Sequence, residues 1–117
     1  MLHFTGEQTP YQVAQWMQQS DCFVLFSNYE NAPVVLSECL ATGLPIISSR
    51  AGGIPEMITE TDGILANTQD EHQLTHAMLW MMEYTSNYPP QHIREHGCKY
   101  SYTAVGKQLV DLYQKVM

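Results

Sequence analysis

The sequence predicts one α/β domain built on a parallel sheet of about four strands, with helices on its faces. Short apolar runs alternate with amphipathic helical patterns along the chain. Proline and glycine stand where the helical patterns begin and end. The 117 residues can form one hydrophobic core but are few for a complete doubly wound domain. We therefore expect a single, incomplete domain over residues 1–117.

Four segments have the composition of short strands: residues 2–5, 22–26, 44–48 and 63–66. The second, CFVLF, is continuously apolar and rich in aromatic and branched side chains, and Asp21 and Ser27 bound it. A run of this kind is typical of a parallel strand that is buried on both faces.

Helices are expected between and after these strands. Thr9 and Pro10 start the first, with Val13, Trp16 and Met17 on its core-facing side. The next helix is expected to start at Pro33, with Asn31 as the better cap, and to end at Gly43. Its apolar stripe holds Val34, Val35, Cys39 and Leu40, with Leu36 nearby. A brief helix over 56–60 follows, and a longer one starts at Asp70 with Leu74, Ala77, Met78 and Met81 inward. The last two helices are expected to start at Pro89–Pro90 and at Ser101.

The composition excludes several classes of function. A net charge of −7, with 12 acidic against 5 basic residues, disfavours nucleic acid as a partner. The sequence has no apolar run of 18 residues and no signal-peptide pattern. Cys22, Cys39 and Cys98 lack metal-site spacing, and the first two lie at apolar positions. A reducing cytoplasm is the simplest location.

The stretch from residue 21 to residue 56 indicates the chemistry. In a parallel sheet, Glu30 and Gly52–Gly53 would follow neighbouring strands at the carboxyl edge, where ligands bind. The helix starting at Pro33 would offer unpaired N–H groups to a phosphate. Carboxylates such as Glu30 and Glu38 repel phosphate but accept hydrogen bonds from hydroxyls. The combination suggests a nucleotide-sugar as ligand.

The motif S-x-x-E-N-x-P-x-V-x-x-E-x-x-A-x-G-x-P-I-I, followed by G-G-x-P-E, resembles the C-terminal, donor-binding domain of retaining GT-B glycosyltransferases of family 4. The start LHFTG and the ending S-Y-x-x-V-x-x-x-L-x-x-L-Y extend the resemblance over nearly the whole chain. It implies a Rossmann-like GT-B domain, a nucleoside diphosphate sugar as donor, and a hexosyltransferase-type activity in cell-surface polysaccharide biosynthesis. It implies no cofactor and no metal.

By the same resemblance, Glu30 would be catalytic and contact the transferred sugar, and Glu38 would bind the ribose. Asn31, Ala32, Val34 and Val35, with Gly52 and Gly53, would bind the donor sugar and the diphosphate. Each assignment has a simpler alternative. Glu30 could be an ordinary loop carboxylate, and Glu38 a solvated or capped helix residue. Gly52 and Gly53 could form a plain tight turn, with Glu56 as a carboxylate at the start of a helix. Ser27 and Ser37 are further candidates to line the crevice.

The resemblance also shows what these residues would lack. The predicted strands look like the third to sixth of the donor domain in the order 3-2-1-4-5-6. The first two strands, the basic residues that contact the diphosphate and the N-terminal acceptor domain would be absent. We therefore expect Met1 to begin a fragment that is inactive alone. Strand 22–26 would then be an open edge, so we expect either direct pairing with strand 2–5 or a homodimer.

Other functions remain as alternatives. A nucleotide-sugar epimerase of GT-B architecture and a non-catalytic α/β module that binds nucleotides or partners would both fit a glycine-rich turn. His72 and His76 have a spacing that suits a metal, as do His92 and His96, but no third ligand is evident, and solvated helix faces are the simpler interpretation. We expect the intact enzyme in the cytoplasm, either free or peripheral to the inner membrane.

Overall fold

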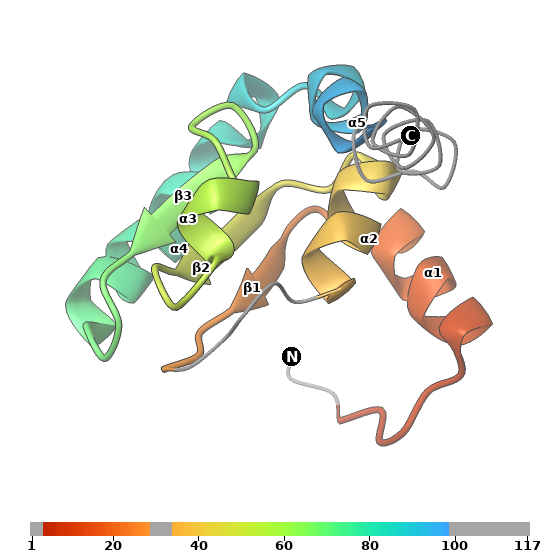
Figure 1. Ribbon diagram of the computed structural model, residues 1–117, viewed down its shortest axis with the longest axis horizontal. Helices are drawn as coiled ribbons and strands as arrows, with labels where there is room; N and C mark the ends of the chain where they lie inside the picture. The colour runs from red at the N-terminus through yellow and green to blue at the C-terminus, as the bar shows by residue number, and fades with distance from the viewer. Residues whose placement is uncertain (1–3, 29–33, 99–117) are drawn as a thin grey trace, which may run out of the picture.

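Three parallel strands form the central sheet of the computed structural model, which describes residues 4–28 and 34–98 (Figure 1). They are β1 (Phe23–Leu25), β2 (Ile46–Ser49) and β3 (Gly63–Ala66), in the spatial order β1-β2-β3. Both pairs of neighbours are parallel. The α/β class and the parallel sheet predicted from the sequence are confirmed.

Among the described residues the sheet has one strand fewer than the sequence suggested. Phe4 and Thr5, the described part of the expected strand 2–5, have no strand conformation, and Phe4 is 92% exposed. No described residue pairs with β1 on the side away from β2, so the direct pairing of the first segment with β1 is not seen for Phe4 or Thr5. Residues 1–3 lie outside the described part of the chain.

Helices cover both faces of the sheet. They are α1 (Pro10–Gln19), α2 (Val34–Thr42), α3 (Ile54–Met57), α4 (Glu71–Tyr84), the 3-10 turn η1 (Thr85–Asn87) and α5 (Pro90–Gly97). α2, α3 and α5 lie on one face, and α1 packs beside α2. α4 covers the other face over β2 and β3. In the described chain no helix is both long and apolar enough to cross a membrane.

The ends of the helices follow the side chains that the sequence offered. Thr9 caps α1: its hydroxyl oxygen accepts a hydrogen bond from the Gln12 N–H, and its own N–H donates to Oε1 of Gln12. Asp70 caps α4 by accepting from the Gln73 N–H at 3.0 Å. Gly43 ends α2 with a φ of +79°, a left-handed conformation that favours glycine. These three predictions are confirmed; the predicted cap at Asn31 and the helix from Ser101 lie outside the described residues.

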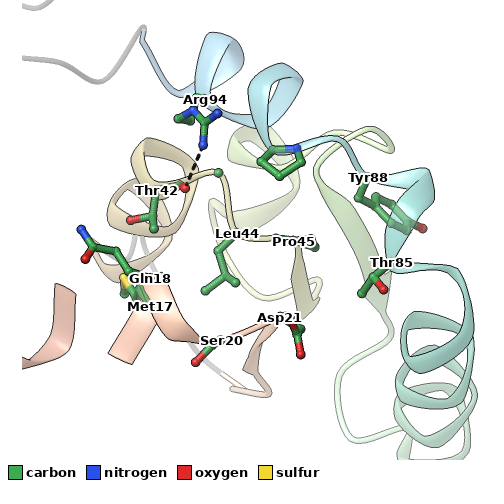
Figure 2. A pocket seen from close by; sticks show the side chains of 12 residues that line it. Met17, Gln18, Ser20, Asp21, Thr42, Leu44, Pro45, Thr85, Tyr88 and Arg94 are labelled. Atoms are coloured by element: carbon green, nitrogen blue, oxygen red, sulfur yellow. Dashed lines mark hydrogen bonds between the residues drawn. The ribbon is translucent and has the colours of Figure 1, made fainter. Parts of the chain in front are cut away.

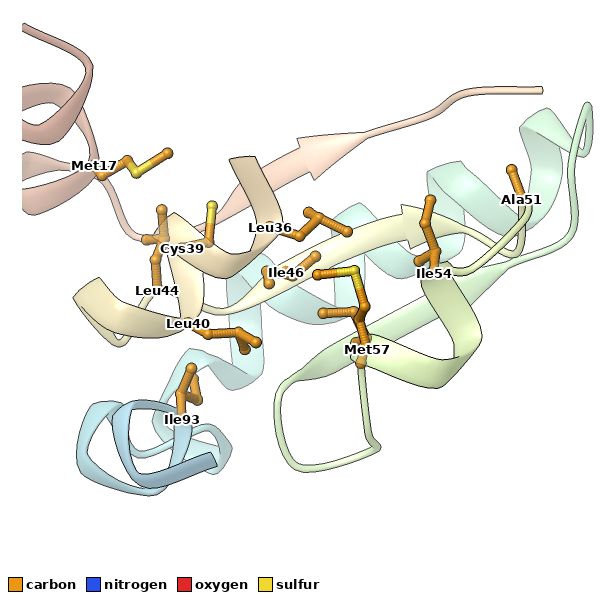
Figure 3. Close-up of a cluster of buried hydrophobic side chains, with 11 residues drawn as sticks. Met17, Leu36, Cys39, Leu40, Leu44, Ile46, Ala51, Ile54, Met57 and Ile93 are labelled. Carbon is orange, nitrogen blue, oxygen red and sulfur yellow. The ribbon is translucent and has the colours of Figure 1, made fainter. Parts of the chain in front are cut away.

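The main core joins β2 to the helices of one face (Figure 3). Ile46 points from β2 towards Leu36 and Leu40 of α2, while its neighbour Ile47 points to the opposite face beneath α4. The other buried members of this cluster are Met17, Cys39, Leu44, Ala51, Ile54, Met57, Ile58 and Ile93. Because all four residues of β2 are buried, this strand is the centre of the domain.

Three side chains that were expected inward are exposed. Trp16 is 49% exposed, and its Nε1 donates to Oε1 of Gln8 at 3.1 Å. Val34 and Met78 are 70% and 44% exposed. For Trp16 and Met78 the reason is that the neighbouring elements cover only part of each helix. α1 buries Met17 alone, and α4 packs over β2 and β3 rather than over β1.

Candidate functional site

The candidate site is the carboxyl edge of the sheet. Because β1 and β2 are parallel, the segments that follow them leave the sheet at the same edge. β1 ends at Leu25 and β2 ends at Ser49, and the turn at residues 51–53 then leads into α3. The described start of α2 and this turn lie near the same end of the sheet (Figure 1). Ligands of open α/β sheets bind at such an edge.

Glu30, Asn31 and Ala32 lie outside the described residues, as does Pro33. Their assignment as catalytic and donor-binding residues therefore stays a prediction. The chain on both sides of them is described, from Ser27–Asn28 at the exit of β1 to Val34 at the start of α2. These two flanks place the ends of the predicted site segment at the carboxyl edge.

Val34 and Val35 are the first two residues of α2 as described. Val34 is exposed, whereas Val35 packs against the main core. N–H groups in the first turn of a helix have no carbonyl partner within that helix, and the helix dipole adds positive potential there. An anion at this end of α2 can thus accept main-chain hydrogen bonds.

Glu38 lies in the second turn of α2 and its side chain is exposed. Its main-chain carbonyl accepts from Thr42 Oγ1 at 2.8 Å, and no described residue bonds to its carboxylate, which can accept hydrogen bonds from hydroxyls of a ligand. Ser37 is less available, because its hydroxyl donates to the Val34 carbonyl at 2.7 Å.

Gly52 and Gly53 form the turn between β2 and α3. Gly52 is exposed with a φ of +52°. Gly53 is the N-cap residue of α3, and as a glycine it has no side chain to accept a capping hydrogen bond. Glu56 is exposed in the first turn of α3, where a carboxylate is favoured by the helix dipole. Arg50 is exposed just before this turn, and its main-chain N–H donates to the Ala66 carbonyl at 2.9 Å.

One buried side chain that the sequence did not predict as part of the site links the ends of β1 and β2 at this edge. Ser49, at the end of β2, is fully buried, and its hydroxyl bonds to both main-chain groups of Ser27. The sequence suggests Ser27 only as a residue that lines the crevice. A serine at the end of a strand carries no sequence signal for such a bond, because the partner is 22 residues away.

The hollow shown in Figure 2 lies at the opposite edge of the sheet, and none of the predicted site residues lines it. Its volume is about 460 Å³, and Leu44 and Pro45 lie at its centre, just before β2. Arg94 reaches from α5 to the Thr42 carbonyl, with Nη1 at 3.4 Å. Since this hollow lies at the amino ends of β1 and β2, it is separate from the candidate site.

The histidines divide into two groups. His72, His76 and His92 are exposed, as expected for solvated helix faces. The same expectation was wrong for His96, whose Nδ1 lies 2.6 Å from Oδ2 of the fully buried Asp62. The packing of α5 brings these two residues together although they are 34 positions apart in the sequence, and helix periodicity cannot predict such a contact. Within the described ranges no three His, Cys, Asp or Glu residues gather as a possible metal site.

The cysteines near the core are poor nucleophiles. Burial, together with a smaller contribution from the nearby charge of Glu38, raises the pKa of the Cys39 thiol to about 12. Burial likewise raises the pKa of Cys22 to about 11. Cys39 is fully buried and Cys22 partly so, in agreement with their apolar positions in the sequence, and neither is suited to catalysis.

Comparison with known proteins identifies the family. The profile of the family described as Glycosyl transferases group 1 matches residues 1–84. D-inositol 3-phosphate glycosyltransferase of Corynebacterium urealyticum is 27% identical over 98% of this chain and 28% of its own length. The amylovoran biosynthesis glycosyltransferase AmsK of Erwinia amylovora is 32% identical over 67% of this chain and 21% of its own.

A solved structure supports the fold. Sucrose-phosphate synthase from Thermosynechococcus elongatus superposes with a TM-score of 0.86 and 23% identity, over 97% of this chain and 30% of that protein. The chain thus spans less than a third of the length of these relatives. It is a Rossmann-like α/β domain of GT-B type that belongs to the group 1 glycosyl transferases, family 4.

Proposed function

We propose that this chain is the donor-binding part of a retaining glycosyltransferase, and that it binds a nucleoside diphosphate sugar at the carboxyl edge of the sheet. The observation that carries the proposal is the convergence at this edge. The parallel pairing of β1 and β2 brings together the start of α2 and the Gly52–Gly53 turn. Glu38 is exposed on the same helix, one turn further on.

The diphosphate and the donor sugar bind to the main chain. The N–H groups of Asn31, Ala32, Val34 and Val35 serve the anion and the sugar, while Pro33 has no N–H to donate. Gly52 and Gly53 allow the backbone to approach the ligand closely, because neither has a side chain to displace it. The positive end of the α2 dipole adds to the attraction for the diphosphate.

The two glutamates have different tasks. Glu38 accepts hydrogen bonds from the ribose hydroxyls, which suits an exposed carboxylate set one turn behind the helix start. Glu30 contacts hydroxyls of the transferred sugar near its reacting carbon, and so acts on the transition state. Oriented main-chain dipoles stabilise the charge on the departing diphosphate, and the proposal requires neither a metal nor a cofactor.

We propose that transfer to an acceptor hydroxyl needs a further domain that these residues do not include. A net charge of −7 gives the diphosphate few basic partners, and Arg50 is the one exposed cation close to the turn in the described chain. The relatives are more than three times as long and have room for both the missing basic residues and an acceptor domain. By itself the chain is expected to bind nucleotide weakly and to be inactive.

Transfer is favoured over epimerisation by the names of the relatives. The matched proteins from Corynebacterium and Erwinia are both glycosyltransferases, one of them in the biosynthesis of a polysaccharide. A cell-surface polysaccharide is accordingly the proposed product class. A cytoplasmic location, free or peripheral to the inner membrane, agrees with three free cysteines and a nucleotide-sugar donor.

We also propose that the chain forms a homodimer through the open edge of β1. No described strand pairs with the outer side of β1, and Val24 in its middle is 41% exposed. Next to it, Met78 and Met82 of α4 are 44% and 81% exposed and line an apolar groove of about 350 Å³. Unpaired strand edges beside apolar surface favour pairing with a second copy.

The proposed function is tested by joining residues 1–117 to the N-terminal part of a family 4 glycosyltransferase. Glu30→Ala is expected to lower the transfer rate by about 100-fold or more while nucleotide affinity changes little, because its contact is with the reacting sugar. Glu60→Ala removes the same charge from an exposed turn ahead of β3 and serves as control. Unchanged transfer in Glu30→Ala would remove the catalytic assignment.

A further inference from the structure

The side chain of Ser49, at the end of β2, bonds to the main chain of Ser27 beyond the end of β1. The main-chain register between β1 and β2 ends where Leu25 faces Ser48. Two residues later, the Ser27 N–H donates to Ser49 Oγ at 3.0 Å, and Ser49 Oγ donates to the Ser27 carbonyl at 2.5 Å. A hydroxyl has one donor and two acceptor sites, so it can make both bonds at once.

This link fixes the point at which β1 leaves the sheet. Ser27 is partly buried and is the second residue after the end of β1, so the link holds the described exit of β1 against the end of β2. Without the hydroxyl, the last main-chain tie between β1 and β2 would lie at Leu25 and Ser48. As an edge strand of three residues, β1 has few other constraints.

The same residue also begins the second loop of the site. Ser49 is 0% exposed and is followed by Arg50, whose N–H is tied to the Ala66 carbonyl of β3, and then by the Gly52–Gly53 turn. One buried side chain therefore connects the origins of both loops at the carboxyl edge. Any shift of β1 along β2 would have to break its two hydrogen bonds.

We propose that Ser49 is a positioning residue of the donor site: its hydroxyl holds the exit of β1, at Ser27, in register with the Gly52–Gly53 turn. The inference rests on the proposed function, because it assigns the purpose of the link to donor binding. Ser49 itself does not reach the ligand, since its side chain is fully buried at the end of β2.

The chain offers a matched control in the neighbouring residue. Ser48 is equally buried, but among the described residues its hydroxyl donates to the adjacent Ser49 carbonyl alone, at 3.2 Å, and does not bridge the strands. Ser48→Ala and Ser49→Ala thus remove the same atom from the same buried strand. Only Ser49→Ala breaks the link to β1, and Ser49→Thr restores a hydroxyl at that position.

The test measures two quantities in the folded 117-residue chain and its variants: amide hydrogen exchange at Ser27, and affinity for UDP-glucose, GDP-mannose and ADP-glucose. Ser49→Ala is expected to speed exchange at Ser27 and to weaken binding of whichever donor the unaltered chain binds, each by about 5- to 10-fold. Ser48→Ala should change neither quantity, and Ser49→Thr should restore both. Circular dichroism confirms that each variant is folded.

The outcomes separate this inference from the function on which it rests. If the unaltered chain binds none of the three donors, the proposed function fails and the role of Ser49 in it fails too. If a donor binds and Ser49→Ala binds it equally well despite faster exchange at Ser27, only the positioning role is overturned. Equal losses in Ser48→Ala and Ser49→Ala would also overturn it, because they would reflect general destabilisation.

Discussion

Nδ1 of His96 in α5 lies 2.6 Å from Oδ2 of Asp62, a carboxylate with no exposed surface at the start of β3. The same oxygen accepts from the N–H and the hydroxyl of Thr59, at 2.9 and 3.0 Å. Neither Oδ1 of Asp62 nor Nδ1 of His96 has a partner that meets hydrogen-bond geometry among the described residues. The 2.6 Å contact is therefore an ion pair when the imidazole is protonated, rather than an aligned hydrogen bond, and it ties α5 to the segment before β3.

Removing that imidazole is expected to destabilise the fold. His96→Ala leaves the Asp62 carboxylate with Thr59 as its remaining partner, at a cost of about 3 kcal/mol. His92→Ala on the same helix removes an exposed imidazole and should change stability by less than about 0.5 kcal/mol. Urea unfolding of the three proteins measures the difference. Equal stability of the two variants would show that the contact with Asp62 contributes nothing.

The buried thiols predict a loss of stability in alkali. The unfolded thiols ionise near a pKa of 9.0, whereas burial holds the folded pKa at about 11 for Cys22 and about 12 for Cys39. Above pH 9 the unfolded state therefore binds fewer protons than the folded state. Their contribution to stability is complete below pH 9.0 and is lost as the pH rises towards the folded pKa values, with a slope of about 1.4 kcal/mol per pH unit for each thiol.

A variant that lacks both thiols isolates this effect. Cys22→Ala/Cys39→Ala should be less stable than the unaltered chain at neutral pH because it leaves cavities, but its stability should fall less steeply above pH 9.0. Urea unfolding across that range gives the two slopes. Parallel curves would contradict the raised pKa values.

The open edge of β1 predicts a dimer. Light scattering should give twice the chain mass of 13.3 kDa, at a salt concentration that screens the net charge of −7. Val24→Lys places a charge on the edge and should return the monomer mass. Leu79→Lys, on an exposed residue of α4 that does not line the groove, should leave the dimer intact. A monomer mass for the unaltered chain at high concentration would refute the assembly.

The sequence predicted the parts of the fold that depend on local chemistry. Thr9, Asp70 and Gly43 end helices through bonds or dihedral angles that nearby residues determine. Leu40 and Cys39 were placed correctly in the core because both α1 and α5 pack against α2. Trp16 and Met78 were placed wrongly, since periodicity indicates an apolar face but not whether a neighbour is long enough to cover it.

The contacts that the sequence could not predict are those between distant polar residues. The Asp62–His96 pair depends on how α5 docks beside β3, and the Ser49–Ser27 link depends on the register of two parallel strands. Neither leaves a local pattern. The predicted site residues differ in kind: motif spacing singled out Glu38, Gly52 and Gly53, and their role in binding stays a prediction. The parallel sheet explains only why the start of α2 and the glycine turn lie at one edge.

The most direct measurement of donor binding follows the amide resonances of the isotope-labelled chain during titration with UDP, GDP and ADP. We expect one of them to shift the amides of Val34, Val35, Gly52 and Gly53. Glu38→Ala should weaken that binding by roughly 1–3 kcal/mol, because a charge-assisted hydrogen bond to the ribose is lost. Glu60→Ala, with the same change of charge at an exposed turn, should bind normally. Shifts confined to other parts of the chain, or equal losses in the two variants, would contradict a nucleotide site at the carboxyl edge of the sheet.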